Sequence, residues 1–298
     1  MNAFRHLSAT LALVAAFSTA VAAPDAVTLT HVHGLAFSAD GERLMIPSHH
    51  GLAVFQDGRW SKAAGPEHDY MGFAATAEAL YSSGHPARGS GLTNPFGVIR
   101  STDGGRKWDS LGMSGESDFH LLAVSHRTNA IYVFNPAPNS RMKSAGVFSS
   151  PNDGFTWRQH TLDGVTGEPT TLAVHPDDPD RFAFGTSEGV YVAQHGKGMQ
   201  RVGRGRITAL WFDLADDSLW VGRYADGPGL ARLDPQTSEL TRIDIPVAEQ
   251  DAVTYVAQNP ARPGEYAIAT FRRNVFVSTD AGRSWSVIAR EGRGIDRD

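Results

Sequence analysis

Histidine is concentrated in one part of this sequence. Seven of the twelve histidines lie between residues 31 and 120, namely His31, His33, His49, His50, His68, His85 and His120. Imidazole is the commonest protein ligand for transition metals and a frequent proton carrier. The sequence therefore points first to a metal site or a proton-transfer site.

Spacing favours some of these residues as ligands. His31 and His33 are two residues apart, so on an extended segment their side chains point the same way. We expect His31, His33, His68 and His120 to be the metal ligands, with His49, His50 and His85 beside or behind them. Asp69 follows His68 directly, and Asp118 lies two residues before His120. We expect these two carboxylates to orient a ligand, to bind the metal or to act as catalytic acids.

The available ligand atoms restrict the metal. The chain has no cysteine, which excludes thiolate sites, disulfides and a cysteine nucleophile. Nitrogen and oxygen ligands suit Cu(II), Zn(II) or Ni(II), and the nearby Met71 and Met142 favour copper. We expect a copper or zinc cofactor that serves metal handling or, if a coordination position stays open, metal-assisted hydrolysis.

A repeat must position these histidines. Six copies of a four-strand pattern begin near residues 33, 71, 119, 170, 207 and 252, with first strands such as HGLAFSAD and MGFAATAE. Spacings of roughly 40 to 50 residues with four short strands each are typical of a β-propeller. The sequence predicts an all-β fold, a single six-bladed propeller of four-stranded antiparallel blades over residues 24–298.

Three repeats carry a sharper motif after the third strand. The segments are Ser101–Trp108, Ser150–Trp157 and Ser278–Trp285, each close to Ser-x-Asp-x-Gly-x-Thr-Trp, with Asn152 in place of one Asp. The chain thus resembles the BNR/Asp-box propellers, which include sialidases, xyloglucanases, sortilin-type receptors and photosystem II assembly factors. We interpret the boxes as structural turns and expect Trp108, Trp157 and Trp285 to be buried.

Alternate loops of a propeller share a face. The boxes lie in loops between third and fourth strands, whereas all seven histidines lie in blade-to-blade loops or in loops between second and third strands. The histidines are therefore expected opposite the boxes, around the channel mouth, where a metal ion or small molecule would bind. The other half of that face carries a charged, arginine-bearing rim expected to meet a protein partner or an anionic ligand: Glu168, Glu188, Arg204, Arg206, Arg223, Tyr224, Asp226, Glu249, Asp251, Arg272 and Arg273.

The first 23 residues have the features of a secretory signal peptide. A basic start at Arg5 is followed by a short apolar run and small residues, with cleavage expected after Ala22 or Ala23. The run is too short to span a bilayer, so we expect a periplasmic or secreted protein with no membrane span after processing. A net charge of −5 gives no basic footprint for nucleic acid.

Two other functions compete with the metal site. A metal-free glycoside hydrolase needs two carboxylates, for which Asp69, Asp118 and Glu188 are candidates. The Arg-Ile-Pro motif of sialidases is missing from the sequence, which counts against sialidase activity. A non-catalytic assembly or recognition scaffold would use the arginine-bearing rim and leave the histidines unexplained.

Overall fold

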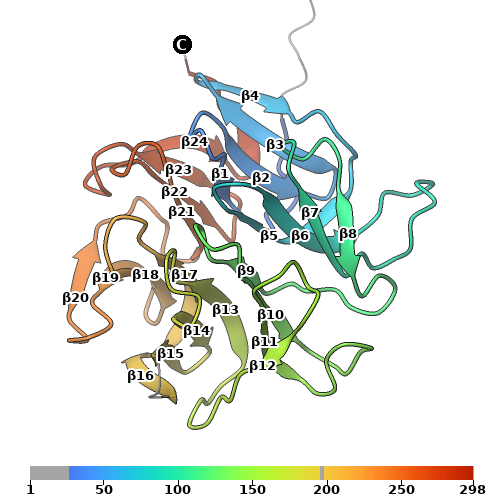
Figure 1. Ribbon diagram of the computed structural model, residues 1–298. Helices are drawn as coiled ribbons and strands as arrows, with labels where there is room; N and C mark the ends of the chain where they lie inside the picture. The colour runs from blue at the N-terminus through green and yellow to red at the C-terminus, as the bar shows by residue number, and fades with distance from the viewer. Residues whose placement is uncertain (1–26, 195–197, 298) are drawn as a thin grey trace, which may run out of the picture.

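Six β-sheets surround one central axis in the computed structural model, which describes residues 27–194 and 198–297 (Figure 1). The six-bladed all-β propeller expected from the repeats is confirmed. The expected signal peptide, residues 1–23, lies outside the described residues, as does His195.

Each of the first three blades has four antiparallel strands in sequence order from the axis outward. Blade 1 comprises β1 (Ala36–Phe37), β2 (Leu44–Ser48), β3 (Gly51–Gln56) and β4 (Arg59–Lys62). Blade 2 comprises β5 (Asp69–Ala75), β6 (Leu80–His85), β7 (Val98–Ser101) and β8 (Asp109–Gly112). Blade 3 comprises β9 (Leu122–Val124), β10 (Ile131–Asn135), β11 (Gly146–Ser150) and β12 (Arg158–Gln159).

The last three blades follow the same order, with one addition. Blade 4 comprises β13 (Pro169–Val174), β14 (Phe182–Thr186), β15 (Gly189–Gln194) and β16 (Gly198–Arg204). Blade 5 comprises β17 (Arg206–Phe212), β18 (Leu219–Tyr224), β19 (Pro228–Leu233) and β20 (Leu240–Ile243). Blade 6 comprises β21 (Val253–Gln258), β22 (Tyr266–Thr270), β23 (Val275–Ser278), β24 (Ser286–Arg290) and the short fifth strand β25 (Arg293–Gly294), which the four-strand expectation missed.

The ring closes where the two ends of the described chain meet. Thr28 pairs with Arg293 of β25, and the Leu29 amide donates to the Gly292 carbonyl over 2.7 Å. Leu29 is buried in an apolar cluster that joins blade 1 to blade 6, which includes Leu44 and Ile288. The segment that enters the histidine region is therefore anchored to blade 6 before it reaches blade 1.

The Asp-boxes form side-chain-capped turns, as interpreted from the sequence. The Asp103 carboxylate accepts the amides of Arg106 and Lys107 at 3.0 and 2.9 Å. In the second box the Asn152 amide oxygen accepts the Thr156 amide at 2.9 Å, so asparagine performs the same task. The boxes thus hold the turns between third and fourth strands.

The box tryptophans are less buried than the sequence predicted. Trp108, Trp157 and Trp285 are half-buried and pack on the edges of three separate apolar clusters. The turns lie at the periphery of the blades, so each indole covers a core instead of filling it.

Replacing Trp108 by alanine is therefore expected to lower the free energy of unfolding by about 2 kcal/mol, below the ~3–5 kcal/mol typical of a fully buried aromatic. The ring lies 4.8 Å from that of Tyr70, and its Nε1 donates to the Gly105 carbonyl. Urea unfolding measures the change. Lys107→Ala, an exposed position in the same turn, should leave stability unchanged; a loss as large for Lys107→Ala as for Trp108→Ala would contradict the account.

His160 makes stability depend on pH. Burial, helped by the charge of Arg158, lowers the pKa of His160 to about 4, while its ring stacks on Tyr132. The unfolded chain binds a proton near pH 6.5, so stability is full above that pH and is lost as pH falls towards 4. Since the ring is partly exposed, we expect a loss of about 1–2 kcal/mol at pH 5.

A pair of unfolding curves at pH 7 and pH 5 measures this loss. The loss between the two pH values should be smaller in His160→Phe than in the parent protein, because phenylalanine keeps the stacking and cannot be protonated. Equal losses in both proteins would show that His160 does not contribute.

Candidate metal centre

The segment before β1 crosses the end of β2 and so brings His31 and His33 to the turn between β2 and β3. The Thr30 amide donates to the Ser48 hydroxyl at 3.1 Å, and the His33 amide donates to the Pro47 carbonyl at 3.3 Å. His49 follows Ser48 directly. The turn therefore lies beside the entering segment, one of the two positions expected from the sequence.

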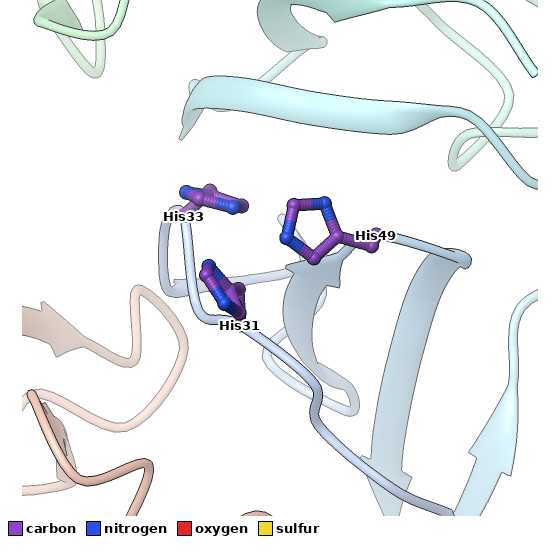
Figure 2. A group of neighbouring side chains, drawn as sticks. All are labelled: His31, His33 and His49. Carbon is purple, nitrogen blue, oxygen red and sulfur yellow. The ribbon is translucent and has the colours of Figure 1, made fainter.

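His31, His33 and His49 converge, and we call these three residues the histidine site (Figure 2). Their ring centroids are 5.5 Å apart for His31 and His33, 4.3 Å for His31 and His49, and 5.2 Å for His33 and His49. One ring nitrogen from each lies within 4.8 Å of the others. The same-side placement of His31 and His33 expected from their spacing is seen in the structure.

Asp69, the first residue of β5, supports the site from blade 2. Its Oδ2 lies 2.7 Å from Nδ1 of His49, so the carboxylate accepts the Nδ1 proton and leaves Nε2 of His49 with a lone pair. Its Oδ1 lies 4.0 Å from Nε2 of His33. A carboxylate behind a histidine is the usual means of orienting a metal ligand.

Two atoms at the site are buried without a hydrogen-bond partner among the described residues. They are Nε2 of His33 and Oδ1 of Asp69. Leaving a buried polar atom unpaired costs about 1–3 kcal/mol, so such atoms indicate a missing partner. A cation between the rings would satisfy the lone pair of His33.

Gly34 allows blades 1 and 2 to approach at this point. Gly34 forms a parallel bridge with Phe73 of β5, and a Cβ on Gly34 would lie 2.6 Å from the Phe73 Cβ. Any residue with a side chain at position 34 would push the entering segment away from β5. Glycine thus keeps the entering segment against β5, on which Asp69 lies.

The surroundings of His33 favour neutral imidazole, which is the ligand form. Burial is the main cause that lowers the pKa of His33 to about 4; the nearby Asp69 opposes this and His49 and His31 add to it. His33 is therefore neutral at neutral pH and has a lone pair available for coordination.

A second group of partners lies beside the histidine site. Oδ2 of Asp118 lies 2.7 Å from Nε2 of His120 and 3.2 Å from Nε2 of His85, whose Nδ1 lies 2.6 Å from the Asn94 amide oxygen. The hydrogen bond to Asp118 raises the pKa of His120, to which the charge of Asp69 also contributes. Asn94 was not anticipated, because nothing in its local sequence marks it.

Of the four expected ligands, His68 and His120 lie outside the group of three, and so do His50 and His85. His68 is buried beneath Tyr70 and Phe96, and its Nδ1 accepts the Ala87 amide at 2.9 Å, so it is a structural residue of blade 2. Residues alternate along a strand, so Asp69 points to the histidine site while His68 and Tyr70 point away. His50 is exposed at the turn beside His49 and is outside the group of three.

A central cavity of about 230 Å³ opens at His33 and His120. Its wall is formed by the innermost strands, mostly by apolar residues such as Leu122 and Leu210. The hydroxyls of Thr170 and Thr208, both on this wall, are buried without partners among the described residues. His33 therefore belongs both to the histidine site and to the wall of this cavity.

No helix within residues 27–194 and 198–297 has the length and apolar content needed to cross a bilayer. No family model and no curated protein matches the sequence.

The comparison with solved structures found other propellers. The GH74 enzyme from Niastella koreensis has a TM-score of 0.60 and 15% identity over 89% of this chain and 46% of that chain. The GH74 xyloglucanase from Xanthomonas campestris has a TM-score of 0.55 and 18% identity over 89% of this chain and 46% of that chain. This chain thus spans less than half the length of either GH74 chain.

A relative of similar length also appears. YCF48 from Cyanidioschyzon merolae has a TM-score of 0.52 and 17% identity over 90% of this chain and 87% of that chain. Identities this low establish the fold alone. With its six blades and three Asp-box turns, this chain has the fold of the BNR/Asp-box-like β-propellers.

Proposed function

We propose that the protein is an exported metal-binding propeller that holds one Cu(II) or Zn(II) ion between His31, His33 and His49. The observation that carries the proposal is the convergence of three imidazoles whose nitrogens lie within 4.8 Å of one another. Zinc or copper with Metal–N bonds near 2.1 Å needs nitrogens about 3.4 Å apart. Small rotations of the rings supply the difference.

The surroundings fit this ligand set. His33 is neutral and its Nε2 has no partner among the described residues, while Asp69 holds His49 in the tautomer that presents Nε2. Three imidazoles without thiolate suit Cu(II) and Zn(II), and three protein ligands leave a position for an exogenous group.

Metal content of the untagged protein isolated from its exporting host tests the proposal. We expect about one equivalent of copper or zinc per chain, and after its removal, one Cu(II) or Zn(II) rebound per chain in a calorimetric titration. A chain isolated without metal that also takes up neither ion would overturn the proposal.

Asp69→Asn is expected to lower metal affinity by about 10–100-fold while the fold is kept. The amide cannot accept the Nδ1 proton of His49 with the strength of a carboxylate, so His49 loses its orientation and basicity. Competition with a chromophoric chelator measures the change. Asp109→Asn, at an exposed position of β8, is the control; equal affinities for the Asp69 and Asp109 variants would contradict the assigned role.

Metal-assisted hydrolysis is a second candidate, favoured by the His120–Asp118 pair. A bound metal would supply a Lewis acid that lowers the pKa of water. His120, with its pKa raised by Asp118, would hold a proton near the channel mouth. Hydrolysis of an activated ester that is lost in His120→Gln while metal affinity is unchanged would support this function, and activity unaffected by that change would exclude His120 from it.

A further inference from the structure

A groove of about 1160 Å³ adjoins the histidine site on the side of blade 6. His31, Val32 and His33 form one part of its wall, and residues of β21 together with the ends of β22 and β24 and the segments that follow them form the rest. Four arginines line it, Arg272, Arg273, Arg290 and Arg293, and we call it the arginine groove. Arg272 and Arg273 were expected on the charged rim, whereas Arg290 and Arg293, at the end of β24 and in β25, were not.

The positive charge of the groove is not neutralised by the protein. Among the described residues no acidic side chain lies within 4.0 Å of the four guanidinium groups, although Arg232, Arg262 and five other arginines elsewhere do form such ion pairs. Glu291 is the one acid in the wall. Nε of Arg273 is buried and has no hydrogen-bond partner within the part of the chain that the structure describes. A concave surface with like charges focuses its field and attracts anions.

The groove is held rigidly. Asp251, which is 2% exposed, accepts the Arg272 amide at 2.9 Å and the Asn274 side-chain amide at 3.0 Å. Arg273 has a left-handed backbone with φ of 62°, a conformation that costs a non-glycine residue energy. A glycine would adopt it without that cost, so the turn is strained at the residue whose side chain lines the groove.

The turns of the groove are also tied to the histidine segment. Nη1 of Arg273 donates to the Thr30 carbonyl at 3.0 Å, and the Gly292 amide donates to the Arg273 carbonyl at 2.9 Å. His31 follows Thr30. The cationic groove and the metal ligands are therefore parts of one fixed surface, and a ligand in the groove has His31 as its neighbour.

Apolar side chains line the groove beside the arginines. Phe271 is 77% exposed at the wall of the groove, and Val32, Tyr255 and Ile295 also line it. Apolar side chains beside arginines suit a carbon skeleton between charged groups. Several guanidiniums along one groove suit more than one carboxylate or phosphate, because each planar fork can bind an oxyanion in a bidentate manner.

We propose that the arginine groove binds a small organic polyanion with at least two carboxylate or phosphate groups, one of which lies beside His31. The groove binds this polyanion without metal. Where the proposed metal is present, an anionic group at His31 adds a ligand to it, and this second part rests on the proposed function.

Calorimetry on the metal-free protein tests the groove first. The probes are tricarballylate, a tricarboxylate with little affinity for metals, and glycerol 2,3-bisphosphate, an organic bisphosphate. We expect one of them to bind with Kd below about 1 mM, and Arg272→Ala and Arg290→Ala each to weaken binding about tenfold. Arg59→Ala, an exposed arginine on β4 outside the groove, is the matched control and should bind as the parent does.

Each result has a defined meaning. Preference for tricarballylate identifies a carboxylate ligand, and preference for the bisphosphate a phosphate ligand. No binding of either probe at about 10 mM, or equal affinity in the parent and the two groove variants, overturns the groove. The titration is then repeated with Zn(II) bound. Tighter binding supports the shared ligand, unchanged affinity removes that part alone, and failure of zinc itself to bind counts against the proposed function while the groove stands.

Discussion

Replacing His31 and His33 together by alanine is expected to weaken binding of Cu(II) or Zn(II) by at least about 1000-fold. The change removes two of the three converging imidazoles, including the neutral His33. Each nitrogen ligand contributes about 3 kcal/mol when a full set of four provides ~10–16 kcal/mol. Calorimetric titration of the metal-free proteins measures the loss.

His50→Ala is the matched control. His50 lies in the same turn as His49 but is exposed and outside the group of three. Its replacement should leave metal affinity unchanged, and both variants should keep the strand content of the parent by circular dichroism. Loss of affinity in His50→Ala equal to that in the double variant would show that the ligand set is wrong.

Asp213→Ala is expected to lower the free energy of unfolding by about 3–5 kcal/mol. Asp213 is 1% exposed between blades 5 and 6. Its Oδ2 accepts the Tyr266 hydroxyl at 2.6 Å and the Trp220 indole at 3.0 Å, and Gln258 donates to its Oδ1 at 3.2 Å. Alanine would leave the Tyr266 hydroxyl and the Trp220 indole without their buried acceptor, and it would remove the carboxylate that lies 3.6 Å from the guanidinium of Arg232.

Urea unfolding of Asp213→Ala and Asp216→Ala distinguishes the stability contribution of the buried network from that of an exposed ion pair. Asp216 is exposed and pairs with the same Arg232 at 2.5 Å, so its loss should cost less than about 1 kcal/mol. Equal destabilisation in the two variants would mean that Asp213 acts only through Arg232.

The blades could be predicted from the sequence because a propeller repeats its pattern locally. Every blade repeats a run of short strands and three blades carry an Asp-box turn, so the kind of loop that holds each histidine could be assigned from the sequence alone. The fifth strand of blade 6 could not be predicted, because it depends on Thr28 pairing with Arg293 across the ring closure. The three box tryptophans were predicted to be more buried than they are, because the motif identifies the residue but not its distance from the propeller axis.

The histidine site was predicted in part for a similar reason. His31 and His33 were assigned correctly to one side from their two-residue spacing. His68 was placed with them because of its loop, but the alternation of His68, Asp69 and Tyr70 already indicated that only Asp69 could share the direction of the site. His49 could not be ranked above His50 from sequence, since its place depends on the hydrogen bond with Asp69 from the next blade.

The central claim is that His31, His33 and His49 bind one metal ion together. X-ray absorption spectroscopy of the protein loaded with one equivalent of Zn(II) tests it most directly, because imidazole gives distinct multiple scattering. The account predicts three imidazole nitrogens at about 2.0–2.1 Å in the parent and two in His49→Ala. A first shell with one imidazole or none, or a spectrum unchanged by His49→Ala, would contradict it.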